Sequence, residues 1–363
     1  MKKLLVVVGT RPNFMKVTRF RNVARAQGGF TVELVHTGQH TDDRMSTVFF
    51  EQFGLVPDRF LTLPDGTPAA RMGHIIIELE QVMRASRPTA VVVVGDVDST
   101  LAAAIAANKL GLPIVHLESG LRSRDMGMPE EVNRILTDRI AAHCLVTEPS
   151  GKENLIAEGV VPERIHMVGN TMIDTLVAFE PGIQASTVLD DLGIPDGGHV
   201  LMTIHRPNNV DEPAPLERLV DLIALLVADH KVIFPVHPRT TRNLERFGLM
   251  ERVRALRGVV LVEPQDYFAF QKLIATSAFV ITDSGGIQEE TTYRGVPCLT
   301  LRPSTERPIT VTEGTNTLIT FDLEQLEMAV ASIRAGSYKK GRIPALWDGH
   351  ATERVFQALD NAL

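Results

Sequence analysis

Residues 281–290 read I-T-D-S-G-G-I-Q-E-E and follow the apolar run 278–280. This pattern predicts a buried parallel strand, a glycine-containing turn and the start of a helix. The first N–H groups of a helix have no partner within it, and they carry the positive end of its dipole. Gly285 and Gly286 would let a phosphate approach this backbone because no Cβ intervenes. The stretch is therefore either an anion site or an ordinary strand–helix turn capped by Ser284.

Two further features favour a nucleoside diphosphate as the anion. Glu289 and Glu290 fall about one turn into the expected helix, where a carboxylate can accept hydrogen bonds from two neighbouring ribose hydroxyls. Residues 302–308, R-P-S-T-E-R-P, follow the next strand and bring Arg302 and Arg307 to the same side of the sheet. Guanidinium groups suit the charge of a diphosphate. We therefore expect this half of the chain to bind a nucleoside diphosphate.

The composition is that of a globular protein with room for two domains, with 363 residues, 44% of them hydrophobic and 22% charged. A net charge of −7 argues against nucleic acid or an anionic membrane as a partner, because both need a basic face. Cys144 and Cys298 lie in apolar runs without a second thiol or a histidine at ligand spacing. We expect both in the core, as in a reducing cytoplasm, and no apolar run reaches the length of a membrane span.

Short Val, Ile and Leu runs alternate with helical patterns along the whole chain. Such runs predict parallel strands covered on both faces, and the alternation restarts after a looser region at 180–198. We expect an α/β fold with two doubly wound Rossmann-like domains, 1–169 with a C-terminal helix 350–363, and 170–349, and a ligand cleft between them. The expected strands are 4–8, 32–36, 90–94, 114–117, 144–146 and 165–168, then 199–203, 231–235, 259–262, 279–281 and 298–301.

Charged residues gather where the strands of the first half end. Arg11 and Lys16 follow the first strand, and a cation at a helix start opposes the dipole, so an anionic partner explains Arg11 better than solvent. Asp96 and Glu118 each follow a strand, and Glu130 begins a helix. Singly these acids have ordinary roles as a cap, an ion-pair partner or a dipole complement. Together they would surround one crevice, where crowded carboxylates can serve as acid and base.

His205 ends the first strand of the second half, where a histidine can protonate a departing phosphate. The residues thus predict a protein for a nucleoside diphosphate conjugate, with acids at the other end of the ligand. A nucleotide-sugar transferase and an isomerase both fit. Neither a G-x-G-x-x-G motif after the first strand nor a Walker A motif is present, which disfavours redox and ATP chemistry.

The motifs, in order, are G-T-R-P, T-G-Q-H, G-D-x-x-S-T, H-x-E-x-G-L-R, M-P-E-E-x-N-R, H-R, H-P, T-D-S-G-G-I-Q-E-E and T-E-R-P, between residues 9 and 308. This series resembles the non-hydrolysing UDP-N-acetylglucosamine 2-epimerases. The resemblance implies a glycosyltransferase-B-like fold, a homodimer, and neither a redox cofactor nor a metal. It also implies interconversion of UDP-GlcNAc and UDP-ManNAc by anti elimination of UDP and re-addition to 2-acetamidoglucal.

The resemblance also assigns roles to residues. The acid and base roles fall to Asp96, Glu118 and Glu130, and His205 stabilises or protonates the leaving UDP. Phe270 matches an aromatic side chain beside uracil. The positions that match diphosphate and ribose contacts are Arg11, Lys16, Ser284, Gly285, Gly286, Glu290 and Arg307.

Several alternatives stay open. Epimerases of UDP-2,3-diacetamido-2,3-dideoxyglucuronate share G-D-x-x-S-T and M-P-E-E-x-N-R, so the substituents at sugar C3 and C6 are undecided. A glycosyltransferase on the same fold needs an acceptor but not three acids near C2, and a binding protein needs neither these acids nor His205. A hydrolysing epimerase would release free N-acetylmannosamine.

The chain departs from the family pattern at the positions of a second, activating substrate site. Many bacterial members have H-R-R-E-N where residues 205–209 read H-R-P-N-N, and Q-H-R-x-M where residues 39–43 read Q-H-T-D-D. Pro207 in place of arginine removes a side chain that could donate hydrogen bonds to a phosphate.

We therefore predict hyperbolic initial rates with UDP-GlcNAc, and reaction of UDP-ManNAc without added UDP-GlcNAc. An activating site coupled by about 1–3 kcal/mol would make the rate curve sigmoidal. A reverse reaction that stays silent until UDP-GlcNAc is added would show that Asp42 and Pro207 do not abolish the site.

Overall fold

The computed structural model describes residues 1–39, 50–194 and 198–363, so His40 and Asp42 lie outside the described residues. The chain divides into two compact units, Met1–Ala178 with Ala345–Leu363, and Phe179–Pro344, called here the first and second domains. The boundaries predicted from the sequence are 169/170 and 349/350. None of the helices within the described ranges is long and apolar enough to cross a membrane.

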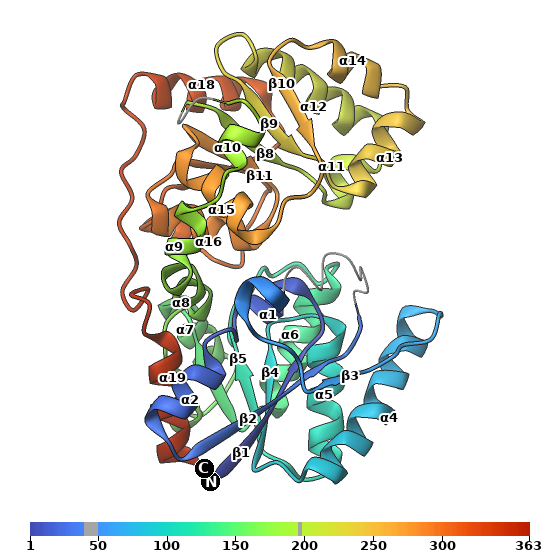
Figure 1. The fold of residues 1–363 in the computed structure, drawn as a ribbon, viewed down its shortest axis with the longest axis vertical. Coiled ribbons are helices and arrows are strands. Elements are labelled where there is room, and N and C mark those ends of the chain that lie inside the picture. Colours follow the sequence, from blue (N-terminus) through green and yellow to red (C-terminus); the bar gives the residue numbers. More distant parts are fainter. Residues whose placement is uncertain (40–49, 195–197) are drawn as a thin grey trace. The chain divides into compact units, whose positions relative to one another are not determined.

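The first domain is built on a parallel sheet with the strand order β3-β2-β1-β4-β5-β6-β7 (Figure 1). Chain order runs outward from β1 in one direction and from β4 in the other, so the order reverses between these two strands. The strands are β1 (Lys2–Val8), β2 (Phe30–His36), β3 (Arg59–Phe60), β4 (Ala90–Val94), β5 (Ile114–Leu117), β6 (His143–Val146) and β7 (Ile165–Met167).

Helices cover both faces of this sheet. Leu5 and Val7 pack in a cluster with side chains of α4 and α5, while the alternating Leu4 and Val6 are equally buried. The helices are α1 (Arg11–Met15), α2 (Phe20–Gln27), α4 (Pro68–Ser86), α5 (Asp98–Lys109), α6 (Pro129–Ile140), α7 (Pro149–Ala157), α8 (Thr171–Ala178) and α19 (Ala351–Ala362), with a 3-10 turn at Pro162–Arg164.

The second domain repeats this plan with the strand order β10-β9-β8-β11-β12-β13, which reverses between β8 and β11. Met202 and Ile281 enter a cluster with α12 and α18, and Leu201 and Val280 enter another with α10 and α15. The strands are β8 (Val200–Thr203), β9 (Val232–Pro235), β10 (Val259–Val262), β11 (Phe279–Thr282), β12 (Cys298–Leu301) and β13 (Asn316–Ile319). The helices are α9 (Glu180–Gln184), α10 (Val188–Asp191), α11 (Pro207–Val210), α12 (Pro213–Leu226), α13 (Pro238–Arg246), α14 (Met250–Ala255), α15 (Tyr267–Thr276), α16 (Gly285–Arg294), α17 (Ile309–Thr312) and α18 (Leu323–Arg334).

The predicted fold class of two parallel-sheet α/β domains is confirmed, and all eleven expected strands are present. The prediction lacked two edge strands. β3 is a two-residue strand with both residues exposed. β13 begins with the buried Asn316, whose amide bonds to Thr300 and Gln288, so an apolar pattern could not reveal it.

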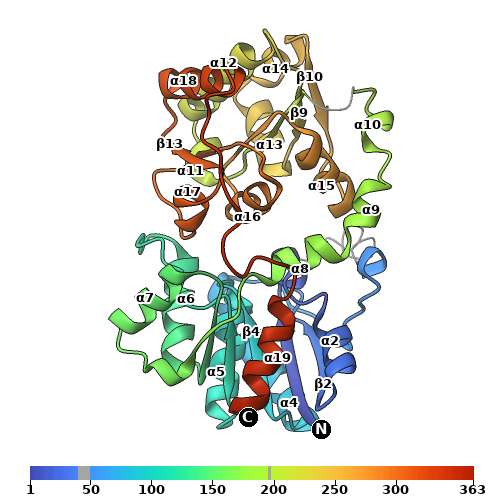
Figure 2. The ribbon, with the colours of Figure 1, turned by 90° about the vertical axis from the view of Figure 1, so that its left-hand side faces the viewer.

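The C-terminal helix α19 returns to the first domain and packs with α2 and α8 (Figure 2). The ring of Phe356 lies 5.5 Å from that of Phe20 and 5.3 Å from that of Phe30, centroid to centroid. Asp174 of α8 caps the helix, since its carboxylate accepts hydrogen bonds from the N–H groups of Ala351 (3.0 Å) and Thr352 (2.5 Å) and from the Thr352 hydroxyl (2.6 Å).

We predict that Asp174→Ala lowers the free energy of unfolding by about 2 kcal/mol, because it leaves buried N–H groups of α19 without an acceptor. Asp360→Ala is the control, since Asp360 of the same helix is exposed and bonds Lys2 at the surface. Its cost should stay below about 1 kcal/mol. Equal losses for the two variants in urea unfolding would contradict a capping role for Asp174.

Candidate active site

Three of the predicted residues of the first domain lie at the point where its strand order reverses. Ligands of doubly wound sheets bind outside the carboxyl ends of the strands at such a point. Arg11 begins α1 directly after β1, and Asp96 follows β4 after Gly95. The structure thus brings Arg11, Lys16 and Asp96 to the carboxyl edge of two neighbouring strands.

Lys16 and Glu118 form a buried ion pair between the Lys16 ammonium and Oε2 of Glu118. The two residues are only 7% and 4% exposed. A Cβ on Gly95 would lie 3.1 Å from Oε2 of Glu118 and 3.4 Å from Nζ of Lys16, so the glycine leaves room for the pair. Glu118 has a φ of 71°, a strained value for a non-glycine residue that is retained most often at functional sites. The lysine assigned to the diphosphate therefore contacts an assigned acid/base residue.

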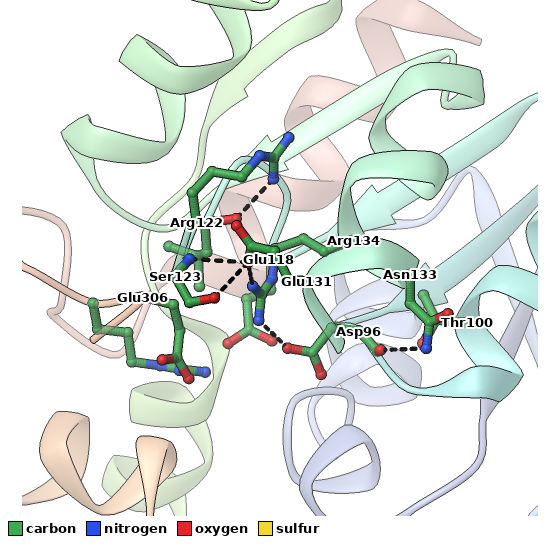
Figure 3. A network of polar contacts seen from close by, with 12 residues as sticks. Asp96, Thr100, Glu118, Arg122, Ser123, Glu131, Asn133, Arg134 and Glu306 are labelled. Atoms are coloured by element: carbon green, nitrogen blue, oxygen red, sulfur yellow. Dashed lines mark hydrogen bonds and ion pairs between the residues drawn. The ribbon is translucent and has the colours of Figure 1, made fainter. Parts of the chain in front are cut away.

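Arg134 links Asp96 to a second acid, Glu131 (Figure 3). The guanidinium is 2% exposed and forms an ion pair with each carboxylate. The side-chain amide of Asn133 donates to the Asp96 carbonyl and to the Asp98 carboxylate, both at 3.0 Å. Backbone and side chain of Asp96 are thus both held by α6.

The two neighbouring glutamates of M-P-E-E have different environments. Glu130, the predicted acid/base residue, is exposed in the first turn of α6. Glu131 is 1% exposed and accepts hydrogen bonds from the N–H groups of Ser123 (2.9 Å) and Arg124 (2.8 Å) as well as from Arg134. Sequence reasoning did not single out Glu131, because the two glutamates are equivalent until the helix orientation is known.

A buried His116–Asp138 pair supports the loops that carry Asp96 and Glu118. Nδ1 of His116 lies 2.6 Å from Asp138, and Nε2 lies 2.7 Å from the Gly95 carbonyl. Burial acts to raise the pKa of Asp138, but His116 and Arg122 outweigh it and hold the pKa at about 2. The sequence signal for this pair was a histidine inside an apolar strand, two residues before Glu118.

At the reversal point of the second domain, His205 lies against Asp283. Nδ1 of His205 is 3.0 Å from Oδ1 of Asp283, which follows the neighbouring strand β11. Asp283 is fully buried, whereas the His205 side chain is 40% exposed. Burial acts to raise the pKa of Asp283, but the hydrogen bonds and charge of His205, with Asn209 and the Arg206 N–H, lower it below its usual range.

The predicted glycine turn is present, and α16 begins at Gly285 with Ser284 as its N-cap. Thr282 orders the turn by accepting the Ser284 N–H at 3.0 Å. A Cβ on Gly285 would lie 2.7 Å from a Glu306 oxygen and 2.8 Å from an Arg307 nitrogen, so side chains crowd this glycine. Gly286 occupies the next position of the helix.

The two arginines predicted for a diphosphate lie in a buried charge network. Arg307 pairs with Glu306 at 2.5 Å and Glu289 at 2.9 Å, and Arg302 pairs with Glu306 at 2.8 Å. Burial acts to raise the pKa of Glu306, but the two arginines shift it far below its usual range. The pairing of Arg302 and Arg307 with carboxylates was not foreseen.

The remaining predicted residues are Glu290 and Phe270. Glu290 is buried in α16, and Phe270 of α15 is half-buried beside the cluster that includes Ile287. Among the residues that the structure describes, no three His, Cys, Asp or Glu side chains are grouped to hold a metal ion.

One reversal point carries carboxylates with their cationic partners, and the other carries a histidine and a helix that begins with two glycines, which is the arrangement expected of an enzyme that acts on nucleotide sugars. The sequence profile described as UDP-N-acetylglucosamine 2-epimerase matches residues 22–360. The chain belongs to this family and is an isomerase, so the resemblance seen in the sequence is confirmed.

Individual relatives support this membership. The chain is 35% identical to the UDP-N-acetylglucosamine 2-epimerase of Methanocaldococcus jannaschii, with 98% of both chains covered. The crystal structure of that enzyme with UDP-GlcNAc and UDP superimposes with a TM-score of 0.89 and 34% identity over 99% of both chains. The UDP-2,3-diacetamido-2,3-dideoxy-D-glucuronate 2-epimerase of Pseudomonas aeruginosa is 38% identical, over 87% of this chain and 88% of the relative.

Glu130 and Glu131 are neighbours in the sequence, so the same substitution at each position compares the stability contribution of an exposed glutamate with that of a buried one. We predict that Glu131→Gln lowers the free energy of unfolding by about 3–5 kcal/mol, because it leaves Arg134 buried without its full partner. Glu130→Gln should change stability by less than about 0.5 kcal/mol, since the side chain is exposed. Denaturant unfolding measures both, and a stability loss in Glu130→Gln as large as that in Glu131→Gln would contradict the assignment.

Proposed function

We propose that this chain is a non-hydrolysing epimerase that interconverts UDP-GlcNAc and UDP-ManNAc. A carboxylate removes the proton at C2, the C1–O bond breaks, and UDP leaves on the opposite face to give 2-acetamidoglucal. A proton then returns to the other face of C2 and UDP adds again at C1. The observation that carries the proposal is the cluster of Asp96, Glu118 and their cationic partners at the reversal point of the first domain.

Two features would help to deprotonate a weak carbon acid. Ion pairs would hold the candidate bases in place, and departure of the leaving group would compensate for the weak acidity of the C2–H bond. Lys16 pairs with Glu118 and Arg134 with Asp96. Proton removal need not come first, because breaking C1–O in the same event places the charge on a phosphate that His205 can protonate. In this proposal Glu130 is the third acid/base residue.

We assign binding of the UDP portion mainly to the second domain. Ser284, Gly285 and Gly286 would offer the N-terminus of α16 to the diphosphate, and Glu290 would accept from the ribose. Phe270 would lie beside uracil. Further charge for the diphosphate would come from Arg11, Lys16 and Arg307.

Other parts of the proposal rest on the family resemblance. The enzyme would act as a homodimer in the cytoplasm and would need no cofactor. A second candidate substrate is UDP-2,3-diacetamido-2,3-dideoxyglucuronate, favoured by the 38% identity to the Pseudomonas aeruginosa enzyme that carries this name. Presenting both nucleotide sugars to the purified protein and identifying the epimer by NMR would decide between them.

We predict that turnover in deuterated water places deuterium at C2 of the recovered UDP-sugar, because the proposed route exchanges this proton with the solvent. NMR and mass spectrometry of the UDP-GlcNAc pool measure it. Glu118→Gln is the matched control, and it should lose epimerisation and exchange together. Epimer formed with full retention of hydrogen at C2 would exclude proton exchange and indicate hydride transfer.

A further inference from the structure

Asp283 lies at the centre of a set of hydrogen-bond donors from the segment that carries His205. Its Oδ2 accepts from the N–H groups of His205 (3.0 Å) and Arg206 (2.8 Å) and from the side-chain amide of Asn209 (3.0 Å). Its Oδ1 accepts from the His205 N–H at 3.1 Å and lies 3.0 Å from Nδ1 of the His205 ring. One buried carboxylate thus contacts both the backbone and the ring of His205.

The strand register explains why Asp283 can reach this segment. Strands β8 and β11 pair in parallel with Thr203 opposite Thr282, and the two threonine hydroxyls are 2.8 Å apart. The residues that follow these threonines therefore leave the sheet side by side. Asp283 turns toward the β8 end, and its backbone carbonyl also accepts from Nε of Arg206 at 2.9 Å.

We propose that Asp283 is the positioning residue of His205, which it holds with a proton on Nδ1 so that Nε2 is the nitrogen that exchanges a proton with the diphosphate. The proposal deepens the proposed function and rests on it. In the forward step the imidazolium gives its Nε2 proton to a phosphate oxygen of the departing UDP. The ring is left neutral, with its remaining proton between Nδ1 and Asp283. The lone pair on Nε2 takes the proton back when UDP adds again.

The neighbouring histidine does not offer the same arrangement. The centroid of the His237 ring lies 5.6 Å from that of the His205 ring. Nδ1 of His237, however, caps a helix by accepting a hydrogen bond from the Arg239 N–H at 3.1 Å. His237 therefore carries its ring proton on Nε2 when neutral. The hydrogen bond at one ring nitrogen determines which nitrogen carries the proton of the neutral ring. Asp283 therefore favours the opposite tautomer at His205, with the proton on Nδ1.

The donor arrangement predicts what an amide would do at position 283. Because Oδ2 accepts from three donors, the side-chain oxygen in Asp283→Asn would take that place and the NH₂ group would take the place of Oδ1. The NH₂ group would then donate to Nδ1 of His205 and force the ring proton onto Nε2. Such a ring has no lone pair on Nε2 to accept a proton. Its lone pair on Nδ1 is taken up by the amide N–H, which disfavours formation of the imidazolium.

The test combines NMR of the ¹⁵N-labelled imidazole rings with steady-state kinetics for the wild type and Asp283→Asn. The His205 signals are assigned by their loss in His205→Gln. In the neutral ring of the wild type we expect the proton on Nδ1, and in Asp283→Asn we expect it on Nε2. For Asp283→Asn we also expect kcat with UDP-GlcNAc to fall about 10²–10⁴-fold and KM to change by less than about threefold.

Asp174→Asn provides the control, because it makes the same chemical change at a buried aspartate of the other domain. It should lower stability and leave the His205 signals where they are in the wild type. A wild-type His205 with its proton on Nε2 would overturn the proposal, and this measurement needs no folded variant.

An Asp283→Asn protein with its proton still on Nδ1 and kcat within about threefold of the wild type would overturn the proposal as well. Failure of the proposed function has a different signature. A wild-type protein that forms no UDP-ManNAc, but whose His205 tautomer changes in Asp283→Asn, would refute the reaction and support the positioning of His205 by Asp283.

Discussion

The candidate site depends on one constraint, the reversal of strand order within a parallel sheet. Where the order reverses, the helices after the two neighbouring strands leave on opposite faces, and the carboxyl ends stay open to a ligand. In the first domain this happens between β1 and β4, and in the second between β8 and β11. Asp96 and His205 both follow strands at these points. The candidate site residues are far apart in sequence, but strand topology brings Arg11 close to Asp96 and His205 close to Asp283.

Buried charges, rather than apolar contacts, fix the side chains at these edges. Lys16 with Glu118, Arg134 with Glu131, and Asp283 with its backbone donors are all removed from water, which costs desolvation energy that apolar packing would avoid. These contacts fix the orientation of the side chains, because an ion pair or a hydrogen bond is satisfied in few geometries. The positive φ of Glu118 adds to this cost, and the buried pair with Lys16 holds the residue in place.

Sequence patterns could predict most of the fold because most strands are apolar on both faces, as the two clusters around Leu201 and Met202 demonstrate. Polar residues at strand ends indicated where the site residues would lie. The sequence could not indicate which of two neighbouring acids points inward, so the buried position of Glu131 next to Glu130 was not predicted. Nor could it reveal Asp283 as the partner of His205, because that contact depends on β8 pairing with β11, strands separated by about 75 residues in the chain.

In the proposed mechanism, the orientation of His205 matters both when UDP leaves and when it adds again. In the proposed elimination the ring gives a proton to the diphosphate, and in the proposed re-addition the same nitrogen recovers it, because the C1–O bond that breaks in the first step forms again in the second. A histidine free to rotate or to change tautomer would be correctly arranged for one step and misplaced for the other. Asp283 contacts the backbone and Nδ1 of His205 together, so its contacts restrain rotation and tautomer at once. A single buried carboxylate can thereby keep Nε2 available as both donor and acceptor throughout the reaction cycle.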